Sequence, residues 1–247
     1  MADQKNPKDV TKRSAPKQSV TKQGVTKQSA PKPKLDKTHV ADTALDLLND
    51  VGLEGLTLRA IAKELNVQAP ALYWHFKNKQ ALLDEMATVM FRRMTEVGGE
   101  VRYEPESSVG WQEWLVRGNR HLRAALLSYR DGAKVFSGSR FTGTDHGPEL
   151  EANLRLLVDA GFTPEQAAWA SSTAYMYTLG FVTEEQSMRQ PAGDGSQPVD
   201  VAERAERLAD YPLAAAAGDQ LFAAYDERFE EGLALIVAGI GARYGVG

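Results

Sequence analysis

The chain has 247 residues, of which 43% are hydrophobic and 25% are charged, close to the average of globular proteins. This composition excludes a fully disordered or fibrous protein, and the absence of cysteine excludes disulfides, thiolate metal sites and a cysteine nucleophile. No apolar run is long enough to span a bilayer, and the first residues lack the apolar core of a signal peptide. We therefore expect a cytoplasmic protein that has no membrane partner.

The charge of the chain is unevenly distributed. Residues 1–34 carry nine lysines or arginines against two acidic residues, whereas the remainder carries 20 basic and 31 acidic residues. The same segment repeats Val-Thr-Lys three times, contains four prolines and has few large apolar side chains. Such a segment cannot bury a core, so the sequence predicts a disordered basic arm over residues 1–34. A basic arm on an acidic body is typical of contact with a polyanion, although a solubilising tail explains the charge equally well.

Helical periodicity begins at Leu35. Apolar residues at positions 40, 44, 47, 48 and 51 share one helical face, and Gly52 is expected to end that helix. Thr57 is a good N-cap for a second short helix, and Pro70 suits the first turn of a third one. Two short helices after a longer one are typical of a helix-turn-helix DNA-binding unit, although a small helical bundle has the same plan.

The remaining chain also has the pattern of helices, and no segment shows the alternation of a strand. We expect helices over residues 80–97, 111–127, 148–160, 163–185 and 218–242, with a loop over residues 188–200. The fold class is therefore predicted to be all-α. The helices at 163–185 and 218–242 carry apolar stripes wide enough to pack across a two-fold axis, which favours a homodimer. The alternative is that both stripes are buried within one subunit.

Several long motifs resemble the TetR family of transcriptional regulators. Residues 35–37, 53–57, 72–75 and 77–84 resemble the DNA-binding domain of that family. Residues 111–114, 124–135 and 178–186 resemble the regulatory domain of the tetracycline-repressor subgroup. The resemblance covers roughly residues 35–186, and the arm predicted at 1–34 has no counterpart in the subgroup. It implies a helix-turn-helix domain at 35–81 and a helical ligand-binding and dimerisation domain, which we place at 82–247. It also implies a repressor that binds a palindromic operator in double-stranded DNA as a homodimer and is released by a small-molecule effector.

The resemblance places the DNA contacts on the second and third helices and at the start of the fourth. The residues concerned are Thr57, Arg59, Gln68, Ala69, Pro70, Ala71, Tyr73, Trp74, His75 and Lys79. Leu58 and Ala69 stand where the subgroup has polar residues that read bases, so we expect a different operator. Leu72 is expected to pack in the core.

The regulatory domain departs from the subgroup at its ligand site. Phe136 stands where the subgroup has its metal-binding histidine, and a phenyl ring offers no ligand to a hard cation. Thr95 likewise replaces a histidine, Gly118 an amide donor and Leu122 a phenylalanine, whereas Arg140 and Glu184 are retained. We therefore expect no metal and no cofactor, and an apolar or aromatic effector other than magnesium–tetracycline.

The candidate ligand-binding residues are Trp111, Trp114, Gly118, His121, Leu122, Phe136, Arg140, Trp169, Tyr175, Tyr177 and Glu184. Each aromatic residue among them has core packing as an alternative role.

Other functions are less well supported by the sequence. The four histidines lack the spacing of a metal-binding helix, and the chain has no Gly-x-Ser-x-Gly motif. Thr144 stands where a phosphate-binding loop needs lysine. We therefore predict no catalytic residues and no enzymatic activity. A transcriptional activator of the same fold and a helical adaptor that does not bind DNA remain alternatives.

Overall fold

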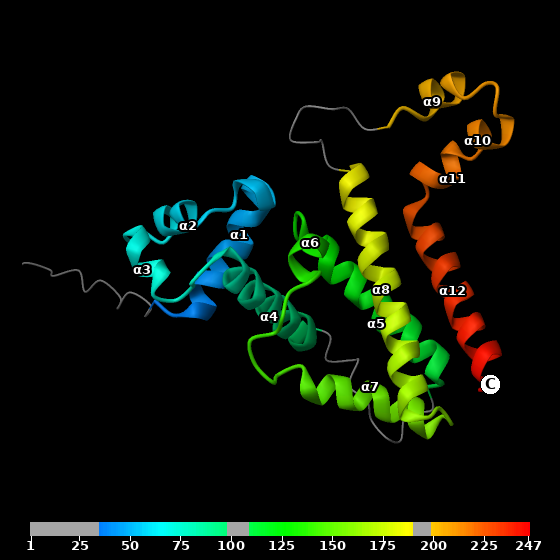
Figure 1. The fold of residues 1–247 in the computed structure, drawn as a ribbon, viewed down its shortest axis with the longest axis horizontal. Coiled ribbons are helices and arrows are strands. Elements are labelled where there is room, and N and C mark those ends of the chain that lie inside the picture. Colours follow the sequence, from blue (N-terminus) through cyan, green and yellow to red (C-terminus); the bar gives the residue numbers. More distant parts are fainter. Residues whose placement is uncertain (1–34, 98–108, 190–198) are drawn as a thin grey trace, which may run out of the picture. The chain divides into compact units, whose positions relative to one another are not determined.

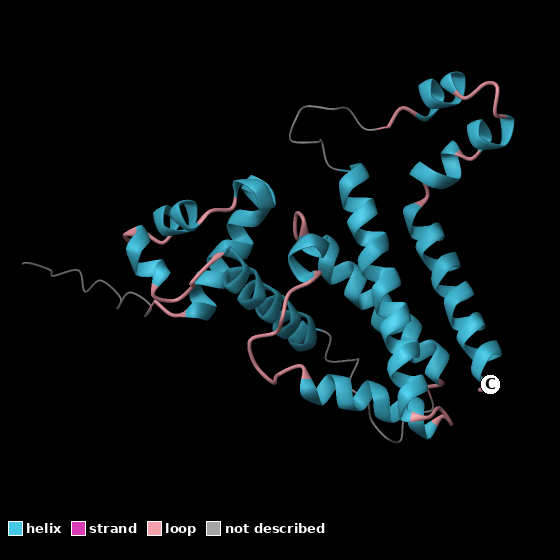
Figure 2. Ribbon diagram, viewed as in Figure 1, coloured by secondary structure: helices cyan, strands magenta, loops and turns pink. Residues whose placement is uncertain are grey.

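The computed structural model describes residues 35–97, 109–189 and 199–247. The predicted arm at 1–34 and most of the predicted loop at 188–200 lie outside the described residues. Across the described ranges, every regular element is a helix and none is a strand (Figure 2), which confirms the all-α prediction.

The first helix, α1, spans Lys37–Gly55 and begins where the Asp36 carboxylate accepts a hydrogen bond from the His39 backbone N–H at 2.9 Å. Its helical geometry breaks at Gly52, whose φ of 68° is open to glycine without a steric penalty. This confirms the predicted end of the regular helix.

The buried face of α1 differs from the predicted one. Its core positions are Val40, Ala41, Ala44, Leu45 and Leu48. Val51, which the apolar pattern assigns to the same face, is 37% exposed.

The next two helices are short. Helix α2 spans Leu58–Glu64, and its first turn is capped by the Thr57 hydroxyl, which accepts a hydrogen bond from the Ala60 N–H at 3.1 Å. A turn through Asn66, with a φ of 53°, leads to α3, which spans Ala69–Tyr73 and has proline in its first turn. The predicted helix-turn-helix unit is therefore present.

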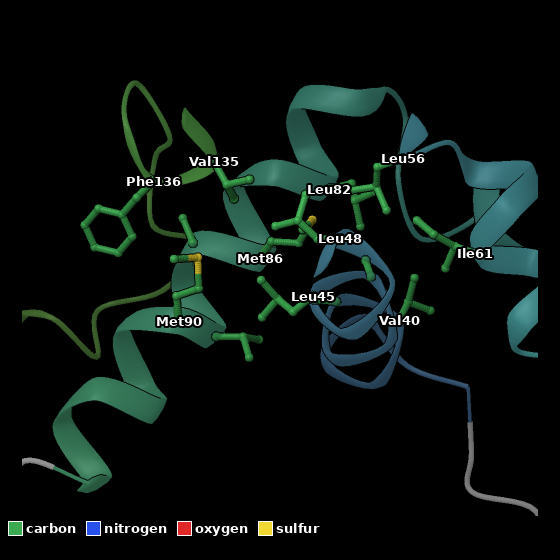
Figure 3. Packing of buried hydrophobic residues seen from close by; sticks show 14 of the residues in the cluster. Val40, Leu45, Leu48, Leu56, Ile61, Leu82, Met86, Met90, Val135 and Phe136 are labelled. Atoms are coloured by element: carbon green, nitrogen blue, oxygen red, sulfur yellow. The ribbon is translucent and has the colours of Figure 1, made fainter. Parts of the chain in front are cut away.

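One core joins this unit to the rest of the protein. Helix α4 spans Lys79–Val97 and packs along α1, with Met86 pointing toward Leu45 and Leu48 and Met90 lying toward Phe136 in the same core (Figure 3). The same cluster continues to Phe136 of the short helix α6. Helix α4 packs on both α1 and α6 in this core. Because the core is close-packed, a displacement of α4 would also displace α1.

The regulatory domain is built around α5 and α8, which pack on each other (Figure 1). Helices α7 and α12 both pack against α8, and a second core fills the space between α5, α7, α8 and α12. The bounds are Trp111–Leu127 for α5, Gly132–Phe136 for α6, Gly147–Asp159 for α7, Pro164–Arg189 for α8 and Tyr225–Tyr244 for α12. In the described part of the chain, no helix combines the length and the hydropathy that a bilayer crossing needs.

The predicted single helix at 218–242 is wrong. The chain instead forms α11, Gly218–Phe222, and then breaks at Ala224, which has a φ of 50° and precedes α12. Alanine is the strongest helix former, so no residue at this point indicated a break. Two further short helices, α9 at Val201–Arg207 and α10 at Pro212–Ala216, were also not predicted.

Candidate functional site: a recognition surface and a cavity joined by one helix

The first candidate site is the surface formed by α2 and α3. Tyr73 is 56% exposed and Trp74 is 90% exposed, while Arg59, Gln68 and Pro70 are also exposed. Large aromatic side chains and an arginine that protrude together provide stacking, hydrogen bonding and charge to a partner. This surface therefore has the chemistry that a DNA groove and its phosphates would require.

The buried side of the same two helices holds them in place. Ile61 and Leu72 are both fully buried in the core beneath the recognition surface. Ala69, Ala71 and His75 are partly buried, so these three predicted DNA-contacting residues lie nearer the base of the surface than its rim.

Two other predicted DNA-contacting residues also have internal partners. The hydroxyl of Thr57 caps α2, as described above, and the ammonium group of Lys79 donates a hydrogen bond to the Leu53 carbonyl oxygen at 2.8 Å. Lys79 is still exposed at the first residue of α4, next to the end of α1. Its present contact ties α4 to the segment that precedes α2.

The second candidate site is a cavity of about 280 Å³ inside the regulatory domain. Helices α4, α5, α7 and α8 supply most of its wall, and the rest comes from Phe136 of α6 and Phe141 of the loop that follows. The lining residues are Phe91, Met94, Thr95, Trp114, Leu115, Gly118, Asn119, His121, Leu122, Phe136, Phe141, Glu149, Asn153, Ser171 and Tyr175.

Six of the eleven candidate ligand-binding residues line this cavity. They are Trp114, Gly118, His121, Leu122, Phe136 and Tyr175. Gly118 leaves open space on the wall, because a Cβ added there would meet nothing within 4 Å. Burial raises the pKa of the Tyr175 hydroxyl further above physiological pH, where a tyrosine is neutral in any case.

Five candidates lie outside the cavity. Trp111 is buried in the second core, where its ring packs edge-on against Phe162 with centroids 5.1 Å apart. Tyr177 stacks on Phe229 and donates a hydrogen bond to the backbone oxygen of that residue at 3.1 Å. Three others have exposed side chains away from the cavity: Arg140, Trp169 and Glu184.

Several residues of the wall were not among the candidates chosen from the sequence. Phe91 and Met94 are three residues apart on α4, and this spacing could have predicted that they share one face of the helix. Phe141, Glu149 and Asn153 come from a loop and from α7, and only the tertiary fold brings them to α4 and α5.

The aromatic part of the wall is a continuous cluster. The Phe141 ring lies 5.1 Å from the Phe91 ring and 5.5 Å from the Phe136 ring, measured between centroids. It also lies 5.1 Å from the His146 ring. Tilted and edge-on contacts of this kind fix the rings relative to one another.

The loop that carries Phe141 is hydrogen-bonded to α4. Thr142 donates from its hydroxyl to the Glu85 carboxylate at 2.7 Å and from its backbone N–H to the Thr88 hydroxyl at 2.9 Å. Farther along the loop, Arg92 of α4 pairs with Asp145 at 2.6 Å. A ligand that displaces Phe141 would therefore pull on α4 directly.

A second link joins the regulatory domain to the end of α1. Asp131, just before α6, accepts a hydrogen bond from the Leu53 N–H at 3.0 Å and pairs with Lys134. Burial by itself would raise the pKa of Asp131, but these two partners hold it below its usual value. The neighbouring Arg130 N–H donates to the Asn49 side chain at 2.8 Å.

A helix-turn-helix head that shares a core with a cavity-containing helical domain is the architecture of a ligand-responsive regulator of transcription. The chain belongs to the TetR family. Residues 40–86 match the family described as bacterial regulatory proteins, tetR family, and residues 104–244 match the tetracyclin repressor-like C-terminal domain. These matches confirm the family that the sequence motifs indicated.

Known proteins support this assignment. The chain is 41% identical to the tetracycline repressor protein class A from transposon 1721 of Escherichia coli, over 85% of this chain and 92% of that protein. It resembles the structure of a TetR variant from Acinetobacter baumannii AYE in complex with minocycline, with 36% identity, a TM-score of 0.64, and coverage of 85% and 99% of the two chains. It also resembles Mycobacterium smegmatis BioQ bound to its natural double-stranded DNA operator, with 30% identity, a TM-score of 0.55, and coverage of 85% and 99%. These relatives are regulators of transcription and not enzymes.

Proposed function

We propose that this protein acts in the cytoplasm as a homodimer that represses transcription from a palindromic operator and leaves it when a small molecule fills the cavity. The observation that carries the proposal is the position of α4. Its Phe91 and Met94 lie on the cavity wall, while the helix packs along α1 of the DNA-binding head with Met86 pointing toward Leu45 and Leu48 (Figure 3). One helix thus contacts both the cavity and α1, the helix on which α2 of the recognition surface packs.

The consequence of moving α4 follows from the geometry of DNA. Two recognition helices of a dimer must lie about 34–36 Å apart to enter successive major grooves. A ligand that shifts α4 changes this separation. A coupling free energy of about 1–3 kcal/mol would lower operator affinity by about 5–150-fold.

The surface of the regulatory domain supports a dimer. Helix α8 exposes Trp169 and Met176, and α12 exposes Leu235 at 65% of its area. Exposed large apolar side chains on neighbouring helices are typical of an interface between subunits. We propose that α8 and α12 form this interface.

We further propose an effector other than magnesium–tetracycline. Phe136 places a phenyl ring on the cavity wall, at the position where the family resemblance predicts a metal-binding histidine. The ring cannot replace imidazole as a metal ligand, so a chelated cation loses a principal contact. The operator should also differ from that of the subgroup, because the two positions that would read bases hold the apolar Leu58 and Ala69.

Operator binding by the full chain tests the DNA-binding part of the proposal. Fluorescence anisotropy would follow binding to the intergenic DNA beside the protein's own gene, with excess nonspecific DNA as competitor. The variant Arg59→Ala removes an exposed arginine from α2 and should weaken specific binding by about 5–150-fold. Arg117→Ala removes an arginine that is also exposed, from α5, and should leave binding unchanged.

Binding that disappears with competitor, or an equal effect of the two substitutions, would contradict the proposal. Addition of magnesium and tetracycline to the protein–DNA complex should cause no release. Release under those conditions would show that our exclusion of this effector is wrong.

A further inference from the structure

We infer that the cavity selects an organic cation with an aromatic body, held between the Glu149 carboxylate and the aromatic wall. The inference rests on the proposed function, since it names the chemical class of the effector. It follows from the charge of the cavity, from the state of its polar groups and from its aromatic lining.

Glu149 gives the cavity its charge. Neither lysine nor arginine occurs among the lining residues, and Glu149 is the lone carboxylate there. Within the described ranges, the Glu149 side chain has neither a hydrogen-bond partner nor an ion-pair partner. An unpaired carboxylate at an apolar cavity disfavours anionic ligands and attracts cationic ones.

Most of the other polar side chains in this region have partners within the protein, including the His121 ring, whose Nε2 lies 3.0 Å from the Met94 carbonyl oxygen. The Tyr175 hydroxyl has no hydrogen-bond partner among the described residues, but it is neutral. The Trp114 indole N–H donates to the Asn153 side-chain oxygen at 2.9 Å, and the Asn153 amide donates to the Ser171 hydroxyl at 2.9 Å. The Asn119 side chain accepts from the Thr178 hydroxyl at 2.7 Å. A ligand therefore finds its strongest unmet polar partner at Glu149.

The aromatic wall favours the same class of ligand. Phe91, Phe136 and Phe141 form the cluster described above, and Trp114 and Tyr175 also line the cavity. The faces of aromatic rings carry negative potential and attract cations, and this attraction is larger when water is excluded. A carboxylate together with several rings accommodates a flat cation better than it accommodates a neutral molecule of equal shape.

The place of Glu149 in the first turn of α7 does not explain why its side chain lines the cavity. An acidic residue in the first turn is favoured by the helix dipole wherever its side chain points. Glu151, two residues later, pairs with Arg155 on the exposed side of the same helix, at 2.7 Å. Glu149 instead lies on the wall of the cavity and has no such partner among the described residues.

A bare metal ion fits this cavity less well. Hard divalent cations take six or more oxygen ligands, or imidazole and carboxylate groups together. Glu149 is one carboxylate and His121 one imidazole on the wall, and the amide oxygen of Asn153 is already a hydrogen-bond acceptor. Among the described residues, no group of three or more histidine and acidic side chains is placed to hold a metal ion. An organic cation needs no such ligand set.

The test compares two probes of the same shape. 1-Methylquinolinium and 1-methylnaphthalene differ in charge and hardly in size, and both are small enough for the cavity. Isothermal titration calorimetry on the full-length protein, without DNA, measures their affinities. We expect the wild-type protein to bind the cation about 5- to 30-fold more tightly than the neutral probe.

Two variants locate the effect. Glu149→Gln should abolish the preference for the cation while leaving the affinity for 1-methylnaphthalene unchanged, which also shows that the cavity is intact. Glu151→Gln is the matched control on the same helix and should behave as wild type. Equal affinity of wild type for the two probes, failure to bind either one, or an unchanged preference in Glu149→Gln would each overturn the inference.

These results do not depend on DNA binding. A protein that binds its operator but ignores the charge of the probe would contradict this inference alone. A protein that prefers the cation but fails to bind the operator specifically would contradict the proposed function instead.

Discussion

Individual residues of the recognition helix show how one element can serve both stability and binding. Leu72 is fully buried and Trp74 is 90% exposed, although only one residue separates them. The burial of Leu72 was expected from the sequence, and the structure confirms it. Trp74 is not among the core residues, and its exposed ring is available to a partner such as the DNA that we propose.

Substitution of these two residues should separate the two roles. Leu72→Ala should lower the free energy of unfolding by about 2–5 kcal/mol, because it leaves a cavity beneath α2 and α3. Trp74→Ala should change that free energy by less than about 0.5 kcal/mol, since its side chain is solvated, yet it should weaken operator binding. Urea unfolding and fluorescence anisotropy would measure the two quantities. Equal loss of stability in both variants would contradict the assignment of Trp74 to the binding surface.

At the scale of elements, contacts between helix ends connect the head to the regulatory domain. Asp131 has a φ of 58° and receives the Leu53 N–H from the end of α1, where Gly52 breaks the helix. The pKa of Asp131 is lower in the folded state than its usual value. Its charged form therefore stabilises the fold at pH values above the ordinary pKa of about 4. That contribution is lost as the pH falls through the lower folded value.

The variant Asp131→Asn tests this link. Asparagine also tolerates positive φ, so the substitution removes the charge without forcing the backbone to move. We expect a loss of about 1–3 kcal/mol in the free energy of unfolding at pH 7, and a difference from wild type that shrinks between about pH 4 and pH 2. Urea titrations across that range would measure it.

Asp145→Asn is the control, because Asp145 belongs to a half-exposed pair with Arg92 whose loss should cost at most about 1 kcal/mol. A difference for Asp131→Asn that stays constant down to pH 2 would show that its charge is not the cause.

At the scale of the whole molecule, the basic segment at 1–34 adds a prediction about binding. We propose that this arm follows the DNA phosphates beside the helix-turn-helix head and raises affinity with little sequence preference. Deletion of residues 1–34 should then flatten the dependence of log affinity on log salt, by about 0.9 for each phosphate that the arm neutralises. Anisotropy titrations over a salt series would measure the slope.

A full-length variant with the nine basic residues of the arm replaced by glutamine keeps the length and should reproduce the effect of deletion. An unchanged slope in both proteins would identify the arm as a passive tail.

The sequence by itself determined the helical class, the helix-turn-helix head and the family. These properties depend on local signals, such as the Thr57 cap, the proline that opens α3 and the periodic apolar positions of α1 and α5. The buried state of Leu72 could also be predicted, because a recognition helix must have one apolar face.

Only the tertiary structure decided which aromatic residues line the cavity and where the last helix breaks. Trp111, Tyr177 and Tyr175 are similar in sequence terms, yet two of them pack in cores and one faces the cavity. Aromatic side chains fill cores and bind ligands through the same surface, so residue type cannot separate these roles. Residue type is equally uninformative for Glu149. A charged residue near a helix start looks like ordinary solvated surface until the fold places it on an aromatic wall.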